Sequence, residues 1–169
     1  KGPGNRFQLN FRNHRKIVVV DGQTAWVGGH NVGDEYVGKD PAVGNWRDTH
    51  VRITGPAALA LQLSFLEDWY WASESLPELR WSPHVPEGED KVHVLIFPTG
   101  PADRLESATL MFMAAINSAR ERIWIASPYF VPDESIMNSL HLAALRGADV
   151  RILFPDKADH LRVYLAAFS

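Results

Sequence analysis

The feature that most constrains the fold is the run Lys-Ile-Val-Val-Val at residues 16–20, which Asp21-Gly22 follows directly. β-Branched residues in succession predict a buried strand, and Asp-Gly is a strong signal for a tight turn. Thr24–Val27 then predicts a second strand, and Gly28-Gly29 ends it. We therefore expect a β-hairpin near the start of the chain.

A loop, a strand and a helix are predicted to follow this hairpin. Residues 32–47 are rich in glycine and predict a loop, whereas His50–Thr54 alternates and predicts a strand. Gly55-Pro56 then opens a helix that continues to about Ser73, because proline is favoured at the first helical position. Large apolar residues recur at helical spacing and predict one packing face: Leu59, Leu63, Leu66, Trp69 and Tyr70. We expect at least Trp69 to be in the core rather than in a membrane-interface belt.

The pattern of predicted elements changes in the second half of the chain. Residues 76–90 contain three prolines and a glycine and predict a linker. Strands and helices are then expected to alternate: strands at 92–97, 123–126 and 150–154, and helices at 104–120 and 134–146. Asp133 can cap the second of these helices and Gly147 can end it. Such alternation predicts parallel strands, so we expect an α/β fold with a mixed β-sheet flanked by helices.

Composition excludes several classes of protein. The 169 residues include no cysteine, so disulfides and thiolate metal sites are ruled out. The net charge is only −3, which gives no global bias toward nucleic acid, and we expect no nucleic-acid partner. No apolar run approaches the length of about 18 residues that a membrane span needs. The first residues lack the apolar core of a signal peptide and the last stretch is still apolar, so we expect a fragment of a longer protein.

A small set of residues around the hairpin suits phosphoryl transfer. His14 and Lys16 are two residues apart, so on an extended backbone they lie on the same face. An imidazole can attack phosphorus or move a proton, and an ammonium can bind the non-bridging oxygens. Asn31 could add an amide donor, and Gly28 and Gly29 would let the backbone approach a phosphate closely. This set needs no metal, and no ligand cluster for one is present in the sequence, so no cofactor is expected.

These residues resemble a known family. His14-x-Lys16-x4-Asp21, followed by Gly28-Gly29-x-Asn31, resembles the HKD motif of the phospholipase D superfamily. Three further blocks resemble bacterial cardiolipin synthases in particular: Asn45-Trp-Arg-Asp-Thr-His50, Ser127-Pro-Tyr-Phe-Val-Pro-Asp133 and Arg146-Gly-Ala-Asp-Val-Arg-Ile-Leu-Phe-Pro155. The similarity covers nearly the whole chain.

The resemblance implies a two-step displacement through a phosphohistidine. His14 would be the nucleophile, while Lys16 and Asn31 would bind phosphate. Asp21 is part of the motif but lies beyond the turn, so a structural role is favoured for it. The resemblance also places at Asp48 a carboxylate that orients the motif histidine; the alternative is a surface ion pair with Arg47 or Arg52. Tyr129 follows the carboxyl end of a predicted parallel strand, where a substrate-contacting loop is expected.

One departure from the family pattern matters. The superfamily carries two HKD motifs, and no other histidine that we tested has lysine two residues later: His50, His84, His93, His141 and His160. We therefore expect residues 1–75 to be the C-terminal part of one repeat, residues 76–90 a linker, and residues 91–169 the N-terminal part of a second repeat without its motif. The missing C-terminal half, or a second copy of the chain, would have to complete the site.

Three functions remain open from the sequence. The blocks favour a phosphatidyltransferase of the cardiolipin synthase type, which uses phosphatidylglycerol as both donor and acceptor. A phospholipase D or nuclease-like hydrolase would have the same motif, because water in place of an alcohol leaves no mark on it. The absent second motif instead favours a non-catalytic fragment that binds headgroups or a partner. A lipid substrate implies a bacterial cell membrane, with the protein peripheral or anchored by segments outside this chain.

Overall fold

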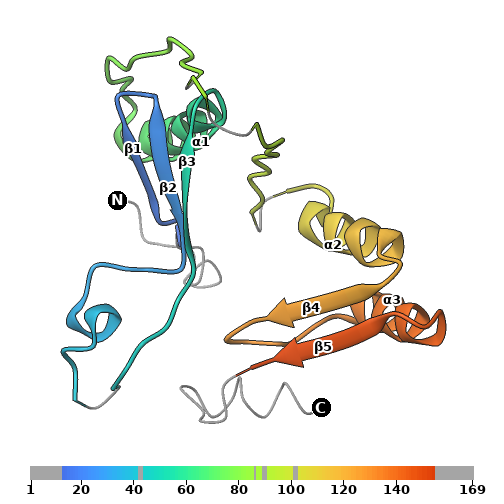
Figure 1. Cartoon of the computed structure of the whole chain (residues 1–169). Coiled ribbons are helices and arrows are strands. Elements are labelled where there is room, and N and C mark those ends of the chain that lie inside the picture. The colour runs from blue at the N-terminus through green and yellow to red at the C-terminus, as the bar shows by residue number, and fades with distance from the viewer. Residues whose placement is uncertain (1–12, 42–43, 86, 89–90, 101–102, 155–169) are drawn as a thin grey trace, which may run out of the picture. The chain divides into compact units, whose positions relative to one another are not determined.

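The computed structural model describes residues 13–41, 44–85, 87–88, 91–100 and 103–154 (Figure 1). The chain divides into two compact units, Lys1–Pro98 and Thr99–Ser169. Each unit has its own sheet, helices and hydrophobic core. The α/β class is confirmed, with antiparallel pairing in the sheet of the first unit and parallel pairing in that of the second.

The first unit is a three-stranded antiparallel sheet with one α-helix packed against it (Figure 1). Its elements are β1 (Ile17–Val20), β2 (Thr24–Gly28), the 3-10 helix η2 (Asp34–Val37), β3 (His50–Thr54) and α1 (Ala57–Ser73). Asp21 and Gly22 have φ angles of 56° and 69°, and the amide of Gln23 donates to the carbonyl of Val20. These are the features of a type I′ turn, so the predicted hairpin is confirmed.

The core of the first unit lies between the sheet and α1. Ala25, Ala58 and Leu61 are buried there, and five half-buried residues pack around them: Ile17, Val19, Val27, Ile53 and Ile96. The predicted packing face of α1 is right only in part, because Leu59 and Leu66 are half-buried but the other three predicted residues are exposed. Leu63 is 50% exposed and Trp69 is 44% exposed, whereas small or polar residues occupy much of the contact. The helix is apolar around most of its circumference, so spacing alone could not single out the face that the sheet covers.

The second unit pairs two parallel strands through a helical crossover (Figure 1). Its elements are α2 (Ser107–Ser118), β4 (Arg122–Ala126), α3 (Glu134–Leu145) and β5 (Asp149–Leu153). The core is formed by Ile116, Ile123, Leu140, Ala143 and Ala148. Asp133 caps α3, as predicted, because its carboxylate accepts a hydrogen bond from the amide of Ile136 at 2.9 Å.

The predicted strand at residues 92–97 is wrong. Residues 91–100 form no regular element, and Leu95 is 78% exposed. Ile96 packs against the core of the first unit instead. An alternating pattern becomes a strand only where a neighbouring strand offers backbone partners. Within the described residues, none of the helices combines the length and apolar character needed to span a bilayer.

Candidate active site

His14 and Lys16 lie side by side immediately before β1. The ammonium nitrogen of Lys16 is 2.8 Å from Nδ1 and 3.1 Å from Nε2 of the His14 ring, and it donates to the His14 carbonyl at 2.9 Å. A neutral imidazole has one acceptor nitrogen, so one of the two ring contacts is a hydrogen bond in a given tautomer. The expected juxtaposition of imidazole and ammonium is therefore present.

The pair faces away from α1. Successive side chains of an extended segment point to opposite sides. Ile17 and Val19 pack toward α1 in the core, whereas Val18 and Val20 are 57% and 47% exposed on the other face. His14 shares the parity of these exposed valines and is itself exposed. The ring is thus accessible to a ligand from solvent.

Asp21 is at the opposite end of β1 from His14. It occupies the first central position of the type I′ turn with a left-handed backbone, which aspartate tolerates better than most residues. Its carboxylate lies 3.5 Å from the guanidinium of Arg80, with 60% of the Asp21 side chain exposed. The structure therefore does not bring Asp21 to the His14–Lys16 pair, and its surroundings are those of a turn residue.

Gly28 and Gly29, at the end of β2, are in close contact with the start of β3 and the residues just before it. A Cβ atom at Gly28 would lie 2.6 Å from the Cα of His50 and would also collide with the carbonyl of Thr49. A Cβ atom at Gly29 would collide with the carboxylate of Asp48. Backbone atoms therefore leave no room for a side chain at Gly28, whereas only a side chain stands against Gly29. Their predicted role in approaching a phosphate remains a prediction.

The Asp48 carboxylate is held by its own neighbours. It accepts hydrogen bonds from the amide of Thr49 at 2.7 Å and from the indole nitrogen of Trp46 at 3.3 Å. Neither His14 nor an arginine is among its hydrogen-bond or ion-pair partners in the described residues. The structure thus places Asp48 against Gly29 and does not bring it to the motif histidine.

Asn31 belongs to a polar and aromatic group after β2. Its amide donates to the hydroxyl of Tyr36, and the Tyr36 ring meets Trp46 edge-on with 5.0 Å between ring centroids. His30 lies between Tyr36 and His50, at centroid distances of 6.0 Å and 5.7 Å. Sequence reasoning missed this group, although two aromatic residues in a glycine-rich loop were a signal for it. Asn31 is exposed, so its amide remains within reach of a ligand.

Tyr129 is in the second unit, in the loop after β4. Its amide and carbonyl both bond to the hydroxyl of Ser127, at 3.3 Å and 2.9 Å, and the residue is 47% exposed. The Ser127 contacts fix the loop backbone and leave the phenol exposed. A substrate-contacting role for Tyr129 remains a prediction.

Two carboxyl groups of the second unit have lowered pKa values. The pKa of Asp133 lies below 3.8, chiefly because the Ile136 amide donates to the charged form. The pKa of Asp149 is lowered chiefly by its hydrogen bond with Arg151, and the Trp124 indole adds to the effect. Both carboxyls have structural partners. Within the part of the chain that the structure describes, no group of His, Asp or Glu side chains could hold a metal ion.

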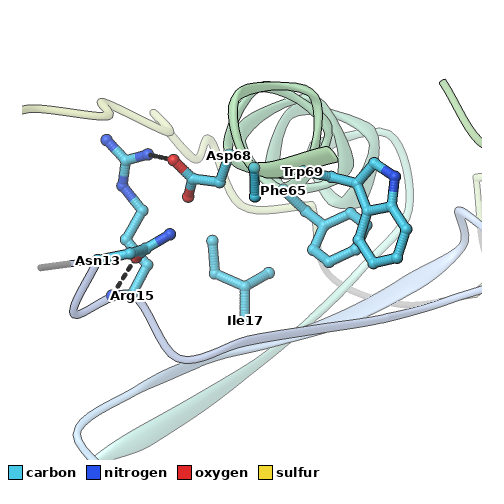
Figure 2. Close-up of a pocket in the computed structure, with 7 residues that line it drawn as sticks. Asn13, Arg15, Ile17, Phe65, Asp68 and Trp69 are labelled. Atoms are coloured by element: carbon cyan, nitrogen blue, oxygen red, sulfur yellow. Dashed lines mark hydrogen bonds and ion pairs between the residues drawn. The ribbon is translucent and has the colours of Figure 1, made fainter. Parts of the chain in front are cut away.

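Behind the motif, on the α1 side, lies a pocket of about 290 Å³ (Figure 2). It is lined by Asn13, Arg15, Ile17, Phe65, Asp68, Trp69 and Ala72. The guanidinium of Arg15 and the carboxylate of Asp68 form an ion pair at 2.8 Å on its wall. On one side the pocket is thus bordered by Asn13, Arg15 and Ile17, which alternate with His14 and Lys16 along the chain.

The chain is similar in sequence to known cardiolipin synthases. Residues 112–168 match the family described as "Cardiolipin synthase, PLD-like domain". The resemblance to the phospholipase D superfamily is confirmed. The chain is 57% identical over 163 residues to cardiolipin synthase A of Pseudomonas fluorescens (strain SBW25), which covers 96% of this chain and 34% of that protein.

Other cardiolipin synthases A are about as similar. The protein of Pseudomonas aeruginosa (strain LESB58) is 55% identical over 163 residues, covering 96% of this chain and 33% of that protein. The protein of Pseudomonas putida (strain GB-1) is 54% identical over 167 residues, covering 99% and 34%. The chain thus spans about a third of the length of the curated relatives that it matches.

Proposed function

We propose that the chain is part of a phosphatidyltransferase of the cardiolipin synthase type. The observation that carries the proposal is the contact between the His14 ring and the Lys16 ammonium on an exposed face. Similarity to cardiolipin synthases A over 96% of the chain supports the same activity. The substrate would be phosphatidylglycerol, and the reaction would take place at a bacterial membrane surface, with the protein peripheral or anchored by segments outside this chain.

In the proposed first step, a ring nitrogen of His14 attacks the phosphorus of one phosphatidylglycerol. A nitrogen–phosphorus bond forms, the bond to the glycerol headgroup breaks, and glycerol leaves with a proton from a second acid. In the second step, a hydroxyl of another phosphatidylglycerol attacks the phosphohistidine and gives its proton to the same second group, which now acts as a base. The nitrogen–phosphorus bond breaks, cardiolipin is released and His14 is regenerated. The ammonium of Lys16 stabilises the extra negative charge on the phosphoryl oxygens in both steps.

The second acid would come from the other HKD motif of the superfamily. The family match over residues 112–168 supports a second repeat in the C-terminal part of the chain. Its start at residue 91, after a linker at 76–90, stays a prediction, because residues up to Pro98 group with the first unit. In this proposal the remaining part of a longer protein, or a second copy of the chain, supplies the second histidine. We therefore expect little or no turnover by the chain alone.

A complementation assay tests the proposal. The chain is incubated with phosphatidylglycerol vesicles, with and without a polypeptide that supplies the C-terminal part of a cardiolipin synthase A, and the lipids are analysed by mass spectrometry. Cardiolipin and free glycerol are expected only with the added polypeptide. His14→Ala should lower the rate by more than about 10³-fold and Lys16→Ala by about 10²- to 10³-fold.

His141→Ala is the matched control, because His141 is an exposed histidine on α3. Its rate should equal that of the parent chain. Activity that survives His14→Ala would overturn the assignment of the nucleophile. Phosphatidic acid in place of cardiolipin would show hydrolysis and contradict the transferase.

A further inference from the structure

His14 and Lys16 lie outside the hydrogen-bonded part of the sheet. Pairing between β1 and β2 begins at Ile17, opposite Val27. His14 and Lys16 come before that point, so ladder hydrogen bonds do not set their direction. Their contact with each other is local and does not tie either of them to another element. A contact with another element is therefore needed to fix the backbone of this segment, so that the His14 ring and the Lys16 ammonium point the same way.

Arg15 makes such a contact. It stands between His14 and Lys16, and its side chain points to the other side of the segment, toward α1 (Figure 2). Its Nη1 atom donates to Oδ1 of Asp68 at 2.8 Å, across 53 residues of sequence. Its backbone amide donates to Oδ1 of Asn13 at 2.9 Å. Arg15 is therefore fixed both within the segment and to a helix.

The surroundings of this ion pair favour a defined geometry. The Arg15 and Asp68 side chains are 32% and 30% exposed, which is about half the exposure of the pair between Arg80 and Asp21. Ile17, Phe65 and Trp69 line the same pocket as the pair (Figure 2). A partly desolvated guanidinium–carboxylate bond is stronger and more directional than a fully exposed one.

We propose that the ion pair between Arg15 and Asp68 positions His14 and Lys16 for their task, with Arg15 and Asp68 as positioning residues. Arg15 is anchored to α1 on one side of the segment, and alternation then projects the ring and the ammonium together on the other side. The catalytic meaning of this arrangement rests on the proposed function, whereas the geometric coupling does not. A side chain on α1 thus controls the orientation of a motif 53 residues earlier in the sequence.

The first test measures the His14 ring in the chain itself. Its two ring nitrogens are followed by ¹⁵N NMR, and its rate of modification by diethyl pyrocarbonate is followed by mass spectrometry. In Arg15→Ala and Asp68→Asn, the Lys16 contact should loosen, the nitrogen shifts should move, and modification of His14 should become about 3- to 10-fold faster, as loss of one hydrogen bond would allow. The double variant Arg15→Asp/Asp68→Arg should restore both signals toward those of the parent.

Arg151→Ala is the matched control. Arg151 forms an ion pair of the same kind with Asp149, at 2.9 Å in the second unit, so its loss should leave His14 unchanged. If a single variant unfolds the first unit, Arg15→Lys keeps the charge but loses the planar fork, and should still alter the His14 signals. His14 signals that stay at parent values in folded Arg15→Ala and Asp68→Asn would overturn the proposal.

Activity in the complementation assay provides a separate readout. Loss of turnover in Arg15→Ala, with recovery in the double variant, is expected if His14 also performs the proposed chemistry. If no variant or parent forms cardiolipin while the NMR signals change as described, the proposed function fails and the positioning role stands.

Discussion

Gly28 pairs with His50 across β2 and β3, with no room for a Cβ atom between them, and Gly28→Ala tests that contact. The added Cβ would lie 2.6 Å from the Cα of His50 and 2.8 Å from its Nδ1 atom. Carbon atoms pack best at about 3.5–4.0 Å, so the two backbones must separate by about 1 Å. Because one of the atoms in the way is backbone, a side-chain rotation cannot relieve the clash.

The expected loss of stability follows from the contacts that this separation of β2 and β3 disturbs. Overpacking of this kind costs about 1–3 kcal/mol. Separation also stretches the hydrogen bond from the Gly29 amide to the Thr49 carbonyl, now 3.1 Å, and losing that bond adds about 1 kcal/mol. We therefore expect Gly28→Ala to lower the free energy of unfolding of the first unit by about 2–4 kcal/mol.

Two further glycines calibrate this value. Gly29→Ala should cost less, about 1–2 kcal/mol, because the Asp48 carboxylate can rotate away at the expense of its bond to Thr49. Gly100→Ala, in the second unit, is the control for the added methyl group, since a Cβ atom there meets nothing within 4 Å, and it should leave β2 and β3 at parent stability. Hydrogen exchange of the β2 and β3 amides in urea measures all three. Equal stability of Gly28→Ala and Gly100→Ala would refute the reasoning.

The second unit gives two more predictions. Asp133→Ala removes the cap of α3 and should speed amide exchange in its first turn. The hydrogen bond from the Ile136 amide lowers the pKa of Asp133 in the folded state. The contribution of the carboxylate is therefore present well above its ordinary pKa and is lost as the pH falls through the folded pKa, so variant and parent should converge in acid; a difference that persists there would contradict this account. Leu140→Ala empties a site that is 4% exposed and should lower the free energy of unfolding of the second unit by about 2–4 kcal/mol, measured by denaturant-dependent amide exchange of β4 and β5; a loss below about 0.5 kcal/mol would contradict the core placement.

Local patterns in the sequence were sufficient for most of the elements. The hairpin was predictable because Asp21-Gly22 suits the left-handed backbone of its turn, and β3 was predicted with its observed bounds. The cap at Asp133 was predictable because its partner lies three residues away. The meeting of His14 and Lys16 was also predictable, since it depends only on spacing of two residues along an extended segment.

Contacts between distant segments needed the tertiary structure. Only the packing of α1 against the sheet decided that Trp69 lines an open pocket and that Asp68 reaches Arg15. Only the approach of β3 to β2 placed Asp48 against Gly29, with hydrogen bonds to its own neighbours and none to the motif histidine in the described residues. The sequence by itself thus determined most of the strands, the turn and the meeting of His14 with Lys16, because residues close along the chain control them. The tertiary structure decided which side chains support that motif, because their partners come from elements dozens of residues away.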